Sequence, residues 1–234
     1  MKTTLILFVA SFAVVAGCRT STSPGNSTGM PITQPGQGSY FVLASTYSDS
    51  NGVAFASDTT VETFVKTGLT IAGKTNVNEL VDSSSYRTSA AGYIHYESNG
   101  DVSAYYPGDT VRGIFGSWIV YPFGTQGTNT YTIDTSLYGT SVHIQMTLAG
   151  AGSGTSKVKG QPVSTEKVSA RFFDVISRTN AGKTFRDTLD ETSMLSLAPS
   201  LGDVVEQSTP GSRDSFTGKM GESSHEIVVD YLLK

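Results

Sequence analysis

His95 and Glu97 are the two residues whose types and spacing come closest to those of a catalytic or metal-binding pair. Side chains two positions apart on a β-strand point to the same face, so the imidazole and the carboxylate would lie together, beside Tyr93 and Tyr106. Such a pair can exchange protons or bind a metal ion. A solvated His–Glu pair on a strand is common, however, and neither a nucleophile nor a third ligand accompanies this one. We therefore predict no catalytic residue, no metal site and no cofactor.

A second group of candidates is aromatic and crowds into residues 93–123. Aromatic strands usually fill a hydrophobic core. They also suit a sheet that holds an apolar ligand or stacks on sugar rings. The candidate ligand-binding residues are Tyr93, Tyr96, Tyr105, Tyr106, Trp118 and Tyr121.

Residues 68–75, GLTIAGKT, match the phosphate-binding P-loop pattern at every fixed position. A P-loop wraps phosphate between a buried strand and a helix. Thr70 and Ile71 are β-branched, however, and suit a strand better than a tight loop. The flanking sequence also lacks alternating β and α segments. We interpret residues 69–72 as part of an ordinary strand.

Short β-rich runs separated by turn signals occupy most of the chain after residue 40. In residues 141–148, Val142, Ile144, Met146 and Leu148 alternate with polar residues, which indicates a strand with one buried face. Residues 77–82 are the one candidate for a turn or two of helix. The predicted fold class is a single all-β domain of mostly antiparallel sheet, as a curved half-barrel or a sandwich.

Asn99-Gly100 between two β-rich runs predicts a two-residue hairpin turn, in which Ser98 faces Asp101. Counting outward from that turn assigns each side chain of the hairpin to a face. One predicted face holds Ile94, Tyr96, Ser103 and Tyr105, and the other holds Tyr93, His95, Glu97, Val102, Ala104 and Tyr106.

The N-terminal 17 residues have the organisation of a secretory signal peptide. Lys2 gives a positive start, residues 5–16 are uncharged, and the run ends in Val15-Ala16-Gly17-Cys18. These last four residues resemble the lipobox of bacterial lipoproteins. The resemblance implies that Cys18 is acylated and becomes the new N-terminus, with enough acyl chains for stable anchoring. Arg19, where an Asp would imply retention at the inner membrane, implies transfer to the outer membrane.

Composition limits the possible disulfides and binding partners and indicates how the chain is divided. Cys18 is the single cysteine, so an intramolecular disulfide is excluded, and the net charge of the whole chain is −4. An acidic protein is a poor electrostatic partner for nucleic acid or for anionic lipid head groups. Residues 19–39 are rich in Ser, Thr, Gly and Pro and predict a flexible tether. The expected division is 1–17 signal peptide, 18–39 lipidated Cys18 and tether, and 40–234 all-β domain.

A further resemblance lies near the C-terminus. The sequence LAPSLGDVVE of residues 197–206, followed by VVDYLLK of residues 228–234, resembles the tail of uncharacterised envelope lipoproteins from the Bacteroidetes and Chlorobi. Ser200, Leu201 and Asp203 depart from the usual pattern of that tail. The resemblance implies a β-sheet and a location in the bacterial envelope.

These observations predict a non-enzymatic lipoprotein that binds a lipid or another apolar molecule on a curved β-sheet. The alternative is an envelope assembly or surface-adhesion protein that binds a protein or a glycan. A hydrolase would need a nucleophile, a base and an orienting group that the sequence does not place together.

Overall fold

The computed structural model describes residues 18–22, 31–84, 92–107, 116–137, 140–180, 183–211 and 222–234, so the predicted signal peptide lies outside the described residues. All regular secondary structure in these residues is β-strand. The strands are β1 (Cys18–Thr22), β2 (Tyr40–Ser48), β3 (Ala54–Ile71), β4 (Lys74–Ser84), β5 (Gly92–Tyr96), β6 (Val102–Tyr105), β7 (Ile119–Tyr121), β8 (Thr128–Leu137), β9 (Thr140–Val158), β10 (Gln161–Asn180), β11 (Lys183–Ala198), β12 (Asp203–Thr209) and β13 (Ser223–Leu232). In this described part of the chain, no helix is long and apolar enough to cross a membrane.

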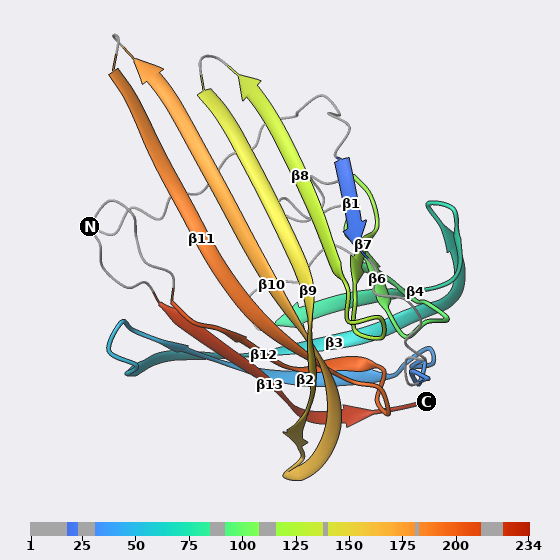
Figure 1. Ribbon diagram of the computed structural model, residues 1–234. Helices are drawn as coiled ribbons and strands as arrows, with labels where there is room; N and C mark the ends of the chain where they lie inside the picture. Colours follow the sequence, from blue (N-terminus) through green and yellow to red (C-terminus); the bar gives the residue numbers. More distant parts are fainter. Residues whose placement is uncertain are drawn as a thin grey trace.

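The strands form one antiparallel sheet in the order β1-β8-β9-β10-β11-β12-β13-β2-β3-β4-β5-β6-β7. The sheet curls until it nearly closes on itself, which confirms the predicted all-β class (Figure 1). The helical turn predicted for residues 77–82 is wrong, because this segment lies in β4 and pairs with both β3 and β5. Hydrogen bonding on both sides outweighs a weak local preference for helix. The P-loop match is a hairpin turn between β3 and β4, with Ala72 and Gly73 at positive φ.

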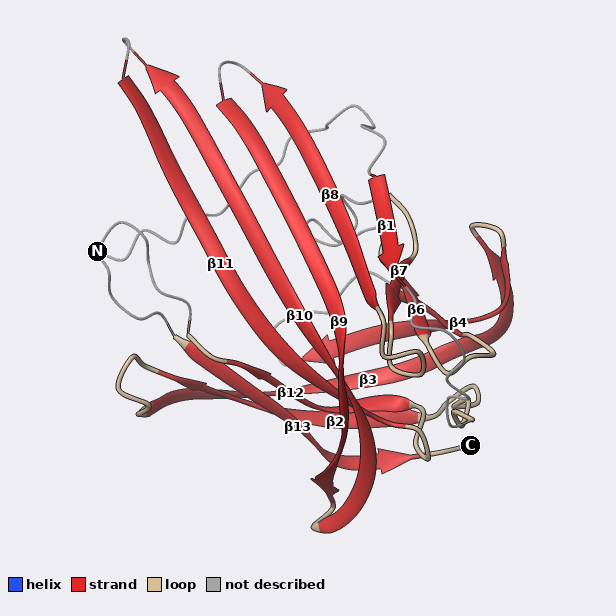
Figure 2. Ribbon diagram, in the orientation of Figure 1, coloured by secondary structure: helices blue, strands red, loops and turns tan. Residues whose placement is uncertain are grey.

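The outer parts of strands β8 to β11 extend beyond the rest of the sheet. Strand β9 has 19 residues and β10 has 20, and their outer parts project away from β12, β13, β2 and β3 (Figures 1 and 2). We call residues 131–137, 140–148, 168–180 and 183–195 the arms. The arms are paired to each other along their whole length, from Leu148 opposite Ala170 to Asn180 opposite Lys183.

The hydrophobic core lies on the inner face of the curl. Phe41, Phe64 and Leu148 are completely buried. The Phe41 ring lies 6.1 Å from that of Phe64 and 6.1 Å from that of Tyr231. Each large apolar side chain buried here contributes about 1.5–3 kcal/mol to the transfer free energy of folding. The core therefore holds the curl together where β2, β3 and β13 face the base of the arms.

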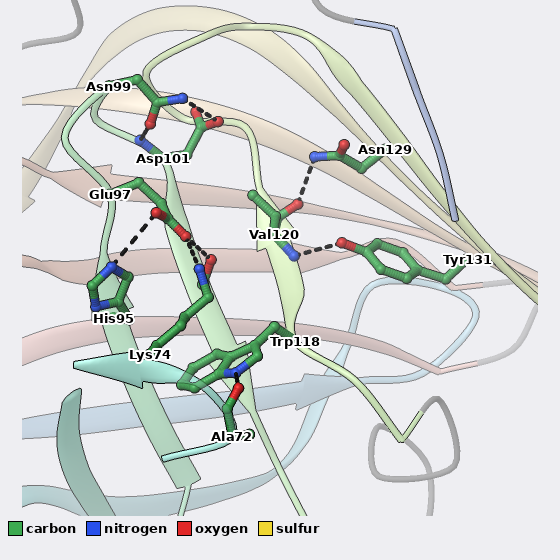
Figure 3. A network of polar contacts seen from close by, with 11 residues as sticks. Ala72, Lys74, His95, Glu97, Asn99, Asp101, Trp118, Val120, Asn129 and Tyr131 are labelled. Carbon is green, nitrogen blue, oxygen red and sulfur yellow. Dashed lines mark hydrogen bonds and ion pairs between the residues drawn. The ribbon is translucent and has the colours of Figure 1, made fainter. Parts of the chain in front are cut away.

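The backbone of edge strand β7 is capped by two side chains of β8. The N–H group of Val120 donates to the hydroxyl of Tyr131 at 2.6 Å, and Asn129 Nδ2 donates to the Val120 carbonyl at 2.8 Å (Figure 3). Tyr131 and Asn129 are 3% and 4% exposed, so both bonds are sheltered from water. Unpaired backbone groups in such a place would cost free energy. The two bonds therefore close the gap between β7 and β8.

The predicted register of the β5–β6 hairpin is wrong by one residue. Glu97 N–H donates to the Asp101 carbonyl at 2.9 Å, and Gly100, with φ +83°, follows the turn as the third loop residue. Tyr93 is thus opposite Tyr105 and Tyr96 is opposite Val102. A shift of one residue moves every side chain of one strand to the other face. The three-residue loop with a left-handed glycine competes with the two-residue turn for the same Asn-Gly sequence.

The predicted tether, residues 18–39, is packed on the sheet at both of its described ends. Residues 18–22 form β1 and pair with β8. Thr33 N–H donates to the Pro199 carbonyl at 2.8 Å, and Gly36 N–H donates to the Lys234 carbonyl at 3.1 Å. Pro35 is fully buried, and a Cβ atom at Gly202 would lie 1.9 Å from the Thr33 carbonyl oxygen. The described ends of this segment are therefore held by backbone hydrogen bonds, which composition does not reveal.

Tyr131→Phe removes the acceptor of the Val120 N–H group and keeps the ring. We expect the free energy of unfolding to fall by about 1–3 kcal/mol, because a buried donor loses its partner. Urea-induced unfolding followed by tryptophan fluorescence measures this change. Tyr47→Phe, at a residue that is 37% exposed, is the matched control and should change stability by less than about 0.5 kcal/mol. Equal stability of the Tyr131→Phe protein and the parent would contradict this role.

Candidate functional site

The six aromatic residues predicted to bind a ligand do not share one surface. Register and burial divide them between the two faces of β5, β6 and β7. Tyr96 is 7% exposed, and its hydroxyl donates to the Gly202 carbonyl at 2.7 Å. The inner-face members, which pack in or against the core, are Tyr96, Tyr106 and Tyr121, and the outer-face members are Tyr93, Tyr105 and Trp118.

The outer-face aromatic residues form a small cluster covered by the β3–β4 turn. The ring of Trp118 lies 5.5 Å from that of Tyr105 and 6.5 Å from that of His95. Lys74 Nζ is 5.5 Å from the centre of the Trp118 ring, and Trp118 Nε1 donates to the Ala72 carbonyl at 3.1 Å (Figure 3). The turn that carries Ala72 and Lys74 thus contacts the Trp118 ring of this cluster.

The structure brings His95 and Glu97 together, as the sequence predicts. His95 Nε2 lies 3.5 Å from Glu97 Oε2, while Lys74 and Ser103 both bond to Glu97 Oε1 (Figure 3). Burial raises the pKa of Glu97, but the bonds from Lys74 and Ser103 outweigh it and lower the pKa overall. A carboxylate held in its ionised form by a lysine is a weak general base. The described residues contain no group of three His, Cys, Asp or Glu side chains that could hold a metal ion.

The inner face of the arms carries apolar side chains with acids among them. Cross-strand partners share a face, so the rows Met146–Phe172–Glu191 and Ile144–Asp174–Leu189 lie on the same side as the core residue Leu148. Exposure rises outward along this face. Leu148 is 0% and Met146 7% exposed, whereas Leu189 on β11 is 40% exposed. The core surface therefore continues onto the arms without a covering layer among the described side chains.

Carboxyl groups border this apolar surface. Strand register places Leu195, Gln207, Glu226 and Ser45 in one row across β11, β12, β13 and β2. Ser45 Oγ donates to Glu226 Oε2 at 2.6 Å. On the neighbouring strands, Glu62 is opposite Asp82. The interior is therefore acidic on β3, β4 and β13, and mixes apolar side chains with Asp174 and Glu191 on the arms.

The acidic groups perturb one another. Burial raises the pKa of Asp203 to about 7, and Asp82 and Glu226 add to that rise. Desolvation, followed by repulsion from Asp203, Asp82 and Glu226, raises the pKa of Glu62 well above its usual range. Asp82 Oδ1 is buried and has no hydrogen-bond partner among the described residues. Every charged neighbour that shifts the pKa of Glu62 is itself an acid, so the site favours protons and cations over anions.

A separate hollow of about 580 Å³ lies at the outer ends of β8, β9 and β10. Its lining is mostly Ser, Thr, Asp and His, and His143 Nδ1 lies 2.6 Å from Asp134 Oδ1 at its edge. Such a lining suits water better than hydrocarbon.

Sequence reasoning found part of this site. The alternation through residues 142–148 correctly predicts one buried face of β9, since Met146 and Leu148 are 7% and 0% exposed. The acidic group was missed, because Glu62 and Asp203 are far apart in the chain and meet only through the curl. One signal was available: Glu62 stands two residues before the buried Phe64 and so must share its inner face.

The fold and site thus define an all-β protein whose single curled sheet is apolar and acidic inside. No family model and no curated protein sequence matches the chain. A solved structure described as an exported protein with a YmcC-like fold, from Bacteroides fragilis, is 10% identical, with 86% of this chain and 99% of that chain covered and a TM-score of 0.42. A lipoprotein structure from Parabacteroides distasonis is 11% identical, with 88% and 100% covered and a TM-score of 0.37. Both scores are below 0.5, so neither similarity carries an inference about this chain.

Asp203→Asn tests the acidic interior through the pH dependence of stability. The pKa of Asp203 is raised from 3.8 to about 7, so the folded protein keeps a proton that the unfolded chain releases. The free energy of unfolding should therefore fall, by up to about 4 kcal/mol, as pH rises from about 4 to about 7. Asparagine does not titrate, so the variant should lose much of the slope between pH 5 and pH 7.5.

Thermal unfolding at a series of pH values measures this slope. Asp190→Asn is the control, because Arg171 lowers the pKa of Asp190 and its titration falls below the window. A slope that is the same in the parent and the Asp203→Asn protein would contradict the assignment.

Proposed function

We propose that the protein is a non-enzymatic, membrane-anchored lipoprotein of the bacterial envelope that binds an apolar or amphipathic molecule on the inner face of its arms. The observation that carries this proposal is the outward continuation of the core surface to Leu189, which is 40% exposed on the inner face. Exposed apolar side chains bordered by polar groups mark binding sites on protein surfaces.

The arms support the proposal better than the aromatic strands. Beneath β5, β6 and β7 the interior is filled, since Ile94, Val102 and Ile119 are all at most 9% exposed. The outer aromatic cluster is covered by the β3–β4 turn, and Trp118 already bonds to Ala72. Neither face of these strands offers an apolar molecule the room that the arms offer.

The carboxyl groups on the inner face limit the charge that the head group of a ligand can carry. Glu226 lies in the same inner-face row as Leu195, and Asp174 and Glu191 lie on the inner face of the arms. The carboxylate of a fatty acid or the phosphate of a lipid would be repelled here, whereas a neutral or cationic head group would be attracted. We therefore expect a neutral or cationic amphiphile.

Anchoring through Cys18 fits the direction of β1. Cys18 pairs with Thr132 and Thr22 pairs with Thr128, so the chain enters β1 from the side of the β8–β9 turn. An acylated Cys18 would therefore hold the arms, and not the opposite end of the sheet, close to a membrane. By its resemblance to lipoproteins that leave the inner membrane, we place the protein at the outer membrane.

Leu189→Glu tests the ligand site. The fluorescent probe 1-N-phenylnaphthylamine is neutral and apolar, and the parent protein should bind it more tightly than the anionic probe 8-anilinonaphthalene-1-sulfonate. Leu189→Glu should weaken binding of the neutral probe by about tenfold, because the apolar contact is lost and a charge is added. Fluorescence titration measures both affinities.

Leu232→Glu is the matched control for this test. Leu232 is 42% exposed but lies on the outer face, opposite Tyr40. Its replacement should leave probe affinity unchanged. Equal loss in both variants, or tighter binding of the anionic probe by the parent, would contradict the proposed site.

Cys18→Ser tests the anchor separately. The acyl chains should no longer be attached, and the protein should move from the membrane fraction to the soluble fraction after cell lysis and alkaline washing. Metabolic labelling with a tritiated fatty acid should mark the parent and not the variant. Unchanged fractionation together with unchanged labelling would contradict lipidation.

A further inference from the structure

The tip of the β10–β11 hairpin combines an exposed aromatic ring with exposed positive charge. Phe185 is 61% exposed, and Arg178 is its cross-strand partner. Arg178 and Arg186 are both exposed, and neither has a carboxylate within ion-pair distance among the described residues. By contrast Arg171, farther down the same arms, is held by Asp190 through two bonds of 2.8 and 2.7 Å.

This charge is unusual for the protein. Residues 175–186 contain Arg178, Lys183 and Arg186 and no acid, while the whole chain has a net charge of −4. The hairpin projects away from β12, β13, β2 and β3, and the nearest acids along it are Asp174 and Asp187, which flank the basic residues (Figure 1). Basic residues beside an exposed aromatic ring are the features of peripheral segments that contact anionic lipid surfaces.

A second hairpin provides a contrast. Phe55, near the β2–β3 turn, is 54% exposed and therefore similar to Phe185 in apolar exposure. Residues 49–58 contain Asp49 and Asp58 and no basic residue, and Asp49 accepts bonds from Asn51 and Val53 in the turn. An anionic surface would repel this hairpin, so exposure alone does not distinguish the two tips, and charge does.

The position of β1 also favours a membrane at the end of the sheet where the β10–β11 tip lies. Cys18 is opposite Thr132, which lies in one row with Gln145 and Phe173. Arg178, the partner of Phe185, is five residues farther along β10, or about 17 Å at 3.4 Å per residue. The N-terminal end of β1 thus points to the same end of the sheet as the tip, with β8 and β9 between them (Figure 1).

We propose that the tip formed by Arg178, Phe185 and Arg186 docks on a bilayer that contains anionic phospholipid. The guanidinium groups contact lipid phosphates and the phenyl ring enters the interface. This contact would be a second attachment, independent of the acyl chains, and would fix the direction in which the arms meet the membrane.

Tryptophan fluorescence of the whole protein in vesicles tests the docking. Phe185→Trp and Phe55→Trp each add one tryptophan to Trp118, and the parent supplies the baseline. In vesicles of brominated phosphatidylcholine with phosphatidylglycerol, the emission added at residue 185 should shift to shorter wavelength and be quenched. The emission added at residue 55 should remain that of a tryptophan in water.

Charge removal completes the test. With Arg178→Gln and Arg186→Gln in the Phe185→Trp protein, the ratio of docked to undocked tips should fall about fivefold for each arginine. High salt or pure phosphatidylcholine should act in the same direction. The proposal would be overturned by an unquenched tryptophan at residue 185. It would also be overturned if quenching were the same with and without the arginines and the anionic lipid. Probe binding in vesicle-free solution is measured separately, so failure here is distinct from failure of the ligand site.

Discussion

The fold depends on how the backbone of one short strand finds its hydrogen-bond partners. Val120 lies in β7, at the edge of the sheet, where a backbone N–H and a carbonyl would otherwise be buried without partners. Tyr131 and Asn129 of β8 supply those partners. By joining β7 to β8 through side chains, the protein bends one long sheet into a nearly closed curl. Its core is therefore enclosed by a single layer.

The inner face of this single curled sheet has two parts, one buried and one exposed. On β2 and β7, at the base of the curl, side chains such as Phe41 and Ile119 are completely buried. The arms extend beyond β12, β13, β2 and β3, so the apolar side chains on their inner face, such as Leu189, stay exposed (Figure 1). The acids on β3 and β13 then give this surface a preference in charge. If the basic tip meets a membrane, the uncovered surface lies next to a source of amphiphiles.

The sequence correctly predicts strand faces, which depend on local alternation. It does not predict features that depend on contacts between distant segments. Met146 and Leu148 are assigned correctly because each strand position has only two possible faces. The β5–β6 register is missed because Asn99-Gly100 fits either a two-residue or a three-residue loop, and packing of Tyr96 and Val102 in the core selects the latter. The acidic interior is missed for a different reason. Glu62 and Asp203 meet only after the curl has formed, so no short segment contains that information.

Native mass spectrometry of the protein purified from bacterial membranes tests the central claim most directly, since the inner face of the arms should carry its ligand through mild purification. We predict an adduct with the mass of a neutral or cationic amphiphile, lost on collisional activation, retained in the Leu232→Glu protein and absent from Leu189→Glu. A bare protein mass in the parent, or an adduct that is equally abundant in both variants, would contradict a ligand site on the arms.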